Sequence, residues 1–205
     1  MCAPFLSETF DNGTLDPRLQ WLNPPSHWNV DKAGSALVVE PNAPTDFWQK
    51  THYGFSADTG HFLHARVEGD FAITANVRFY PVHQYDQAGL MVRLDEHCWL
   101  KTSVEYELAD PPKLGAVVTN AGYSDWSVQE FDRTRNDLWL RIERNGNDCM
   151  VDHSLDGAHW ISMRVAHLHS DSKSAQCGLY ACSPKGSGFR AEFRNLLIET
   201  PEDRP

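Results

Sequence analysis

The chain has 205 residues, of which 41% are hydrophobic and 22% are charged. These proportions are ordinary for a globular domain in water, and the length suits one domain that buries roughly 70% of its unfolded surface. The formal net charge of -10 disfavours nucleic acid and anionic membranes as partners, because phosphate binding requires clustered lysine and arginine.

The cysteines and the absence of long apolar segments indicate the cellular compartment of the protein. The five cysteines are an odd number, lie far apart and include no C-x-x-C pair, which predicts free thiols in a reducing compartment. No apolar stretch reaches about 18 residues, and the N-terminus lacks a basic segment followed by an apolar run. We therefore expect a cytoplasmic protein, unless a signal peptide has been removed.

Short extended segments separated by turns make up the first third of the chain. Turn residues occur at Asp11-Asn12-Gly13 and at Pro24-Pro25. Residues 35–41 are a predicted strand, and residues 45–55 are a second one, on which Trp48 and His52 would share a face. Residues 61–81 predict two strands joined through 68–70, because apolar side chains alternate from Phe71 to Phe79.

The strongest period-two alternation lies between residues 84 and 120. It predicts three consecutive strands, at 84–95, 99–107 and 113–120. On the first strand, Ala88, Leu90 and Val92 would face the core. The opposite face of the three strands would carry polar and aromatic side chains, which makes it the candidate functional surface.

The C-terminal half continues as strands and turns. Residues 120–131 are predicted to be a loop, residues 138–168 a meander with turns at 145–147 and 156–157, and residues 176–184 and 189–199 the last strands. The pattern predicts an all-β protein, an antiparallel β-sandwich or barrel, as a single domain over residues 1–205. Its core would span about 21–199, followed by a polar tail at 200–205.

Several segments together resemble a known family. They are TDFWQKTHYGF, YDQAGLMVRLD, WLKTSVEY, VVTNAGYSDWS and YACSPKGSGF, in that order. They are similar to domain of unknown function 1349, a concanavalin A-like family that includes a fungal protein named as a regulator of enolase. The resemblance covers about residues 21–199 and implies a jelly-roll sandwich of two antiparallel sheets with a concave face. Function does not follow from it, because one fold hosts many activities.

Two carboxylates are the sharpest chemical feature of the polar face. Glu105 and Glu107 would lie roughly 6.5 to 7 Å apart at alternate positions of one strand, given about 3.3 Å of rise per residue. That spacing permits glycoside hydrolysis, for which the carboxyl groups lie about 5 to 9.5 Å apart. Jelly-roll glucanases usually carry an E-x-D-x-E pattern, which Ser103–Glu107 lacks. The alternative is a pair of solvated carboxylates that form cross-strand ion pairs with Lys101 and Arg93.

Aromatic residues are the second feature of that face. Trp48, Trp99 and Trp126, with Tyr85 and Tyr123, fall on or beside it, and flat rings stack on the CH faces of sugars. Polar side chains could line the same groove, namely His52, Gln87, Arg93, Lys101, Glu105, Asn120 and Asp125. The alternative is that tryptophans fill the core, a role we assign to Trp21, Trp28, Trp139 and Trp160.

Metal and cofactor signatures are weak. The histidine pairs 61 and 64, and 167 and 169, lack a third ligand at a recognisable spacing. No calcium-binding loop, P-loop or G-x-G-x-x-G motif occurs. We expect no cofactor and no metal.

Three functions remain open, and we rank them in order. The first is a carbohydrate- or glycoside-binding protein that uses the polar and aromatic groove. The second is a cytoplasmic regulatory protein with a protein partner, as the enolase-linked relative implies. The third is a carbohydrate-active hydrolase or lyase, with Glu105 as general base or nucleophile and His52 or Glu107 as acid.

Overall fold

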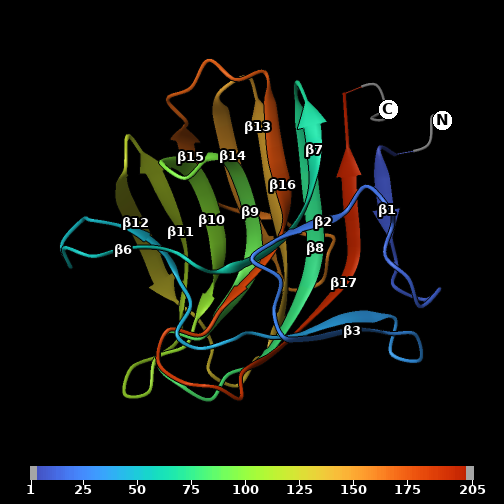
Figure 1. Ribbon diagram of the computed structural model, residues 1–205, viewed down its shortest axis with the longest axis vertical. Coiled ribbons are helices and arrows are strands. Elements are labelled where there is room, and N and C mark those ends of the chain that lie inside the picture. Colours follow the sequence, from blue (N-terminus) through green and yellow to red (C-terminus); the bar gives the residue numbers. More distant parts are fainter. Residues whose placement is uncertain (1–3, 202–205) are drawn as a thin grey trace.

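Two antiparallel β-sheets pack face to face in the computed structural model of the protein, which describes residues 4–201 (Figure 1). The predicted all-β, concanavalin A-like sandwich is confirmed. No helix in the described part of the chain is long and apolar enough to cross a membrane.

The eight-stranded sheet has the order β15-β14-β13-β8-β17-β4-β3, with β1 paired to β17. Its strands are β1 (Leu6–Glu8), β3 (His27–Asp31), β4 (Ala36–Glu40), β8 (Phe71–Tyr80), β13 (Asp137–Asn145), β14 (Asp148–Ser154), β15 (Ile161–His167) and β17 (Arg190–Glu199).

The seven-stranded sheet has the order β12-β11-β10-β9-β16-β7-β2. Its strands are β2 (Gln20–Leu22), β7 (His61–Glu68), β9 (Gln87–Asp95), β10 (Cys98–Glu105), β11 (Lys113–Asn120), β12 (Tyr123–Glu130) and β16 (Ser174–Cys182). A separate hairpin consists of β5 (Phe47–Gln49) and β6 (Ser56–Asp58).

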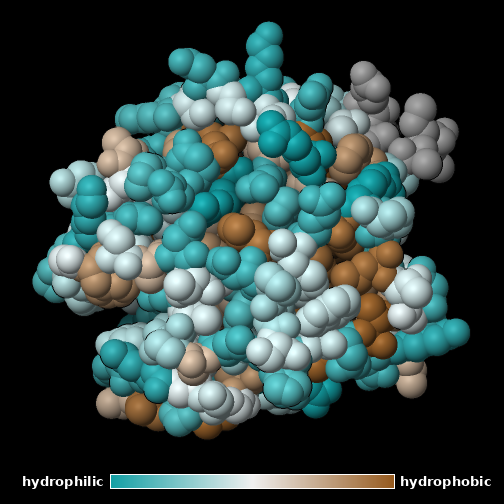
Figure 2. Space-filling model, viewed as in Figure 1, coloured by the Kyte–Doolittle hydropathy of each residue, from teal (hydrophilic) through white to brown (hydrophobic). Residues whose placement is uncertain are grey.

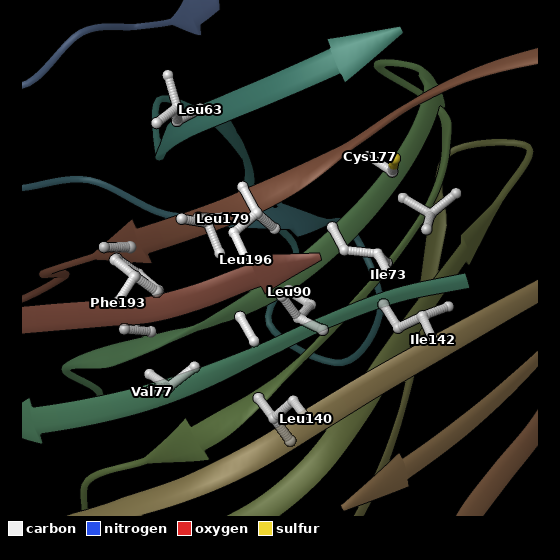
Figure 3. Close-up of a cluster of buried hydrophobic side chains, with 14 of the residues drawn as sticks. Leu63, Ile73, Val77, Leu90, Leu140, Ile142, Cys177, Leu179, Phe193 and Leu196 are labelled. Carbon is white, nitrogen blue, oxygen red and sulfur yellow. The ribbon is translucent and has the colours of Figure 1, made fainter. Parts of the chain in front are cut away.

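The main core lies between the two large sheets (Figure 3). Leu90 on β9 is fully buried and faces the same cluster as Ile73 and Val77 on β8, from the opposite sheet. Ala88 and Val92 belong to this cluster too, so the predicted inward face of β9 is confirmed. The strand register follows from this alternation, because a slip of one residue would place the apolar side chains in water.

Four cysteines, at positions 98, 149, 177 and 182, are free and buried, as predicted for thiols. The fifth, Cys2, lies outside the described residues, as do residues 202–205 of the predicted polar tail. Of the tryptophans assigned to the core, Trp21 is partly buried and packs against the main core cluster. Trp28 is 39% exposed, and neither it nor the half-buried Trp139 and Trp160 belongs to a core cluster, so the assignment was wrong for these three.

Two predicted elements differ from the structure. Residues 45–55 do not form one strand, because the short β5 ends at Gln49 and a turn follows. Residues 123–130 form strand β12 rather than a loop. β12 is an edge strand, and five of its eight residues are exposed. It therefore lacks the apolar alternation by which strands are identified.

A second apolar cluster lies on the outer face of the seven-stranded sheet, beneath the β5–β6 hairpin. Phe47 and Trp48 from β5 pack there against Trp99, which is fully buried. The remaining buried members are Phe62, Met91, Val117, Tyr180 and Cys182. The face predicted to be a polar groove is therefore apolar along much of its length, and only the part beyond the hairpin stays open.

Candidate functional site

A cavity of about 270 Å³ opens where the β5–β6 hairpin leaves the sheet. We call it the hairpin cavity; it is lined by Asp46, Trp48, Tyr53, Phe55, Tyr85, Gln87, Lys101, Glu105, Glu107, Val117, Trp126, Pro184 and Lys185. The surface in Figure 2 is indented at its left edge, between the hairpin and the loops drawn below it in Figure 1.

The turn of the hairpin brings aromatic side chains to the cavity. Lys50 and His52 have φ angles of 54° and 63°, and Gly54 has 71°, so the chain reverses within residues 50–54. The indole Nε1 of Trp48 donates a hydrogen bond to the carbonyl of Thr51 at 3.1 Å. The ring of Tyr53 then packs edge-on against Trp48, with centroids 5.5 Å apart. Tyr53 is 57% exposed, which leaves most of this ring available to a ligand.

Gln87 connects the charged groups on the floor of the cavity. Its Oε1 accepts hydrogen bonds from Lys101 Nζ at 2.8 Å and from the Tyr180 hydroxyl at 3.1 Å. Its Nε2 donates to Glu105 Oε2 at 3.0 Å. The other oxygen of Glu105, Oε1, accepts no hydrogen bond from the described residues, so it is free to bond a ligand.

The charge of Lys101 is compensated within the protein. The side chain is 3% exposed, and Nζ donates to the Phe47 carbonyl at 2.7 Å and lies 3.5 Å from Asp46 Oδ1. A buried ammonium requires such partners, because its desolvation is costly. Lys101 therefore orients Gln87 and anchors β5 rather than presenting a free positive charge.

The environment alters the acidity of both glutamates. Burial raises the pKa of the Glu105 carboxyl to about 8; Lys101 opposes the rise, and the carboxylates of Asp46 and Glu107 add to it. Burial also raises the pKa of Glu107, with a further contribution from Asp110. Glu107 Oε2 accepts a hydrogen bond from Gln84 Nε2 at 2.7 Å. At neutral pH, Glu105 is thus a protonated acid that can donate as well as accept.

A second, more open cavity of about 530 Å³ adjoins the first. We call it the edge cavity; it is lined by Trp48, Thr51, His52, Tyr53, Tyr123, Ser124, Asp125 and Trp126. Trp48, Tyr53 and Trp126 line both cavities. Asp125 accepts a hydrogen bond from Arg164 at 2.8 Å, and Lys50 Nζ lies 5.1 Å from the centre of the Tyr123 ring.

Most of the side chains predicted for the site line one of these cavities. Trp48, Gln87, Lys101, Glu105, Glu107 and Trp126 line the hairpin cavity. His52 and Asp125 line the edge cavity, so His52 shares no cavity with Glu105. Strand β10 ends at Glu105, and Glu107 follows in the connection to β11, yet both reach the same cavity.

Arg93 and Asn120 line neither cavity. Arg93 is 6% exposed and forms two hydrogen bonds with Asp58 of β6, at 2.7 and 2.8 Å. Asn120 lies on the inner face of β11, where its amide donates to the His167 carbonyl and accepts from the His169 backbone. The predicted common groove therefore excludes both, and the predicted ion pairs of Arg93 and Lys101 with the glutamates are replaced by pairs with Asp58 and Asp46.

Sequence reasoning missed Tyr53, Phe55 and Lys185 as cavity residues. The strand predicted over residues 45–55 places Tyr53 on the face opposite Trp48, but these residues include a turn that brings the two rings together. The glycine at position 54 was the available signal, since Gly commonly provides positive φ in turns. Lys185 comes from a distant loop, and its Nζ lies 5.5 Å from the centre of the Tyr85 ring.

No group of three or more His, Cys, Asp or Glu side chains is placed to hold a metal ion within the described part of the chain.

Residues 21–201 match the model of a family described as "Protein of unknown function (DUF1349)". The chain belongs to this family. It is 36% identical over 183 residues to Regulation of enolase protein 1 of Saccharomyces cerevisiae, a match that spans 88% of this chain and 89% of that protein. The family predicted from the sequence is thus confirmed.

Solved structures show the same fold. A functionally unknown protein from Saccharomyces cerevisiae superposes with a TM-score of 0.83 and 33% identity, over 90% of this chain and 97% of that one. A xylan beta-1,4-xylosidase from Bacillus halodurans superposes with a TM-score of 0.76 and 14% identity. That match covers 95% of this chain but 39% of the xylosidase, so this fold corresponds to one part of the larger enzyme.

Proposed function

We propose that the protein binds a neutral sugar or glycoside in the hairpin cavity. The observation that carries the proposal is the combination of exposed aromatic rings with Glu105, whose Oε1 accepts no hydrogen bond from the described residues. The raised pKa of Glu105, about 8, supports the proposal because it favours the protonated carboxyl group at neutral pH. Tyr53 and Trp126 offer flat surfaces to the CH face of a sugar ring, and Glu105 can bond a hydroxyl group. The charge of Lys101 is already compensated, which favours an uncharged ligand.

Relatives of this fold suggest which sugars to test first. Part of a named xylosidase shares the fold, so xylose and xylosides are reasonable first probes, with glucose and galactose beside them.

Isothermal titration calorimetry with each sugar tests the proposal. We expect one of these sugars to bind, and Glu105→Gln to weaken that binding at least about tenfold, because an amide is a weaker hydrogen-bond donor than the carboxylic acid it replaces. Glu130→Gln on the exposed part of β12 is the matched control and should bind as the wild type does. If no sugar binds, or if both variants bind equally well, the proposal fails.

Hydrolysis is a separate question at the same site. A raised pKa is what a general acid needs at neutral pH, and Glu105 has one. Release of nitrophenol from aryl xylosides and glucosides would identify a hydrolase. Binding without release would identify a binding protein.

A regulatory role is the second candidate, favoured by the end-to-end similarity to Regulation of enolase protein 1. In that case the protein would bind another protein rather than a sugar. The test is to mix the purified chain with purified enolase and measure both complex formation and enolase activity. If no complex forms and enolase activity does not change, the regulatory role is rejected.

A further inference from the structure

We propose that the hairpin cavity and the edge cavity form one elongated site for an unbranched oligosaccharide, with a sugar ring on each side of Tyr53. This inference rests on the proposed sugar binding and specifies the class of ligand as a chain of at least two rings. The observation behind it is that the two cavities share three aromatic residues as a common boundary: Trp48, Tyr53 and Trp126.

The size of the hairpin cavity limits what it can hold alone. Its volume of about 270 Å³ lies below the roughly 300–1,000 Å³ of typical small-molecule sites. One sugar ring fits such a space, whereas a longer ligand must continue outward. The edge cavity, with about 530 Å³, provides the space immediately next to it.

The boundary between the cavities is suited to a ligand that passes across it. Tyr53 is 57% exposed, and its ring is held from two sides, by Trp48 at 5.5 Å and by His52 at 4.7 Å between ring centroids. A ring held in this way loses little conformational freedom when a ligand stacks on it. An exposed aromatic residue fixed between two hollows is better explained by a ligand that contacts both than by packing within the protein.

The edge cavity has the chemistry of a second sugar subsite. Tyr123 is 60% exposed on one side of it, and Lys50 lies over that ring. Asp125 is held by Arg164, so its carboxylate is oriented and remains able to accept a hydroxyl hydrogen bond. Like the hairpin cavity, this one combines an aromatic surface with a fixed polar group.

Calorimetric titration with two series of probes tests the inference: xylose to xylotetraose, and glucose to cellotetraose. In the series that binds, we expect the affinity to rise about tenfold from one ring to two or three, because the second ring gains its own aromatic stacking contact. A tenfold rise corresponds to about 1.4 kcal/mol. Tyr123→Ala, which alters the edge cavity alone, should abolish that gain and leave the affinity for the monosaccharide unchanged.

Glu105→Gln is the matched variant for the other cavity and should weaken binding at every chain length. Equal affinity for one ring and for four would overturn the elongated site while leaving the proposed sugar binding intact. A uniform loss in Tyr123→Ala, at unchanged melting temperature, would also overturn it. Failure of every probe to bind would remove the proposed function itself.

Discussion

Arg93 on β9 and Asp58 on β6 form two hydrogen bonds, of 2.7 and 2.8 Å, that fasten the β5–β6 hairpin to the seven-stranded sheet. The Arg93 side chain is 8% exposed and that of Asp58 is 31% exposed. The pair therefore holds in place the segment that carries Trp48 and Tyr53. The position of the cavity walls depends on it.

Replacing Asp58 by Ala should destabilise the protein by about 1–3 kcal/mol, because it leaves a buried guanidinium without its partner. Urea denaturation measures the loss. The double variant Arg93→Met with Asp58→Ala should recover part of it, since no buried charge then remains unpaired. If the double variant is less stable than Asp58→Ala alone, Arg93 stabilises the protein mainly through contacts other than its pairing with Asp58.

Leu90→Ala should cost about 2–5 kcal/mol of unfolding free energy, because the fully buried side chain lies in the core between the sheets. Val128→Ala is the comparison: it removes methyl groups from a residue that is 46% exposed, so the effect should stay within about 0.5 kcal/mol. Similar losses for the two variants would contradict the described strand register.

Gly89 allows β9 and β10 to approach each other closely. A Cβ atom at this position would lie 1.9 Å from the backbone oxygen of Thr102, which belongs to the neighbouring strand and cannot move aside as a side chain can. Gly89→Ala should therefore lower stability by about 3 kcal/mol or more. Thermal unfolding measures this, with Ser127→Ala on β12 as the control. A melting temperature equal to that of the control would show that the strands can separate at low cost.

The fold could be predicted from the sequence because most strands are indicated by the alternation of apolar and polar residues within a short segment. Ala88, Leu90 and Val92 alternate with outward-facing residues, and a half-buried strand is the only regular element with that period. Strand β12 could not be predicted in this way, because most of its side chains are exposed and apolar residues do not alternate along it.

The candidate site was only partly predictable because its contacts join distant parts of the chain. Glu105 and Gln87 were both predicted on the polar face from strand alternation, and they are cross-strand partners in the β10–β9 register. Nothing in the sequence indicated that Asp58 would pair with Arg93, or that Phe47 would cover Trp99. These contacts depend on how the hairpin folds over the sheet, which local alternation does not specify.

Stability should fall as the pH rises from about 4.5 to about 8, through Glu105. The pKa of this carboxyl group is about 8 in the folded protein, against an ordinary value of 4.5. Within that window the unfolded chain has lost the proton and the folded protein keeps it, so raising the pH favours unfolding. His64 acts in the opposite sense below its ordinary pKa of 6.5, because burial lowers its folded pKa to about 4 and acid favours the unfolded state.

Glu105→Gln separates these two contributions. The amide cannot ionise, so the variant should keep the loss of stability in acid and show a smaller loss between about pH 5 and pH 8. The loss that remains comes from Glu107, whose pKa burial also raises. Urea unfolding at several pH values gives the difference in free energy between variant and wild type. We expect that difference to shift steadily in favour of the variant as the pH rises, since only the wild type has to keep a proton on a buried carboxyl group. A difference that stays constant over this range would mean that Glu105 ionises normally in the folded protein, and the cavity would then present a carboxylate rather than an acid to its ligand.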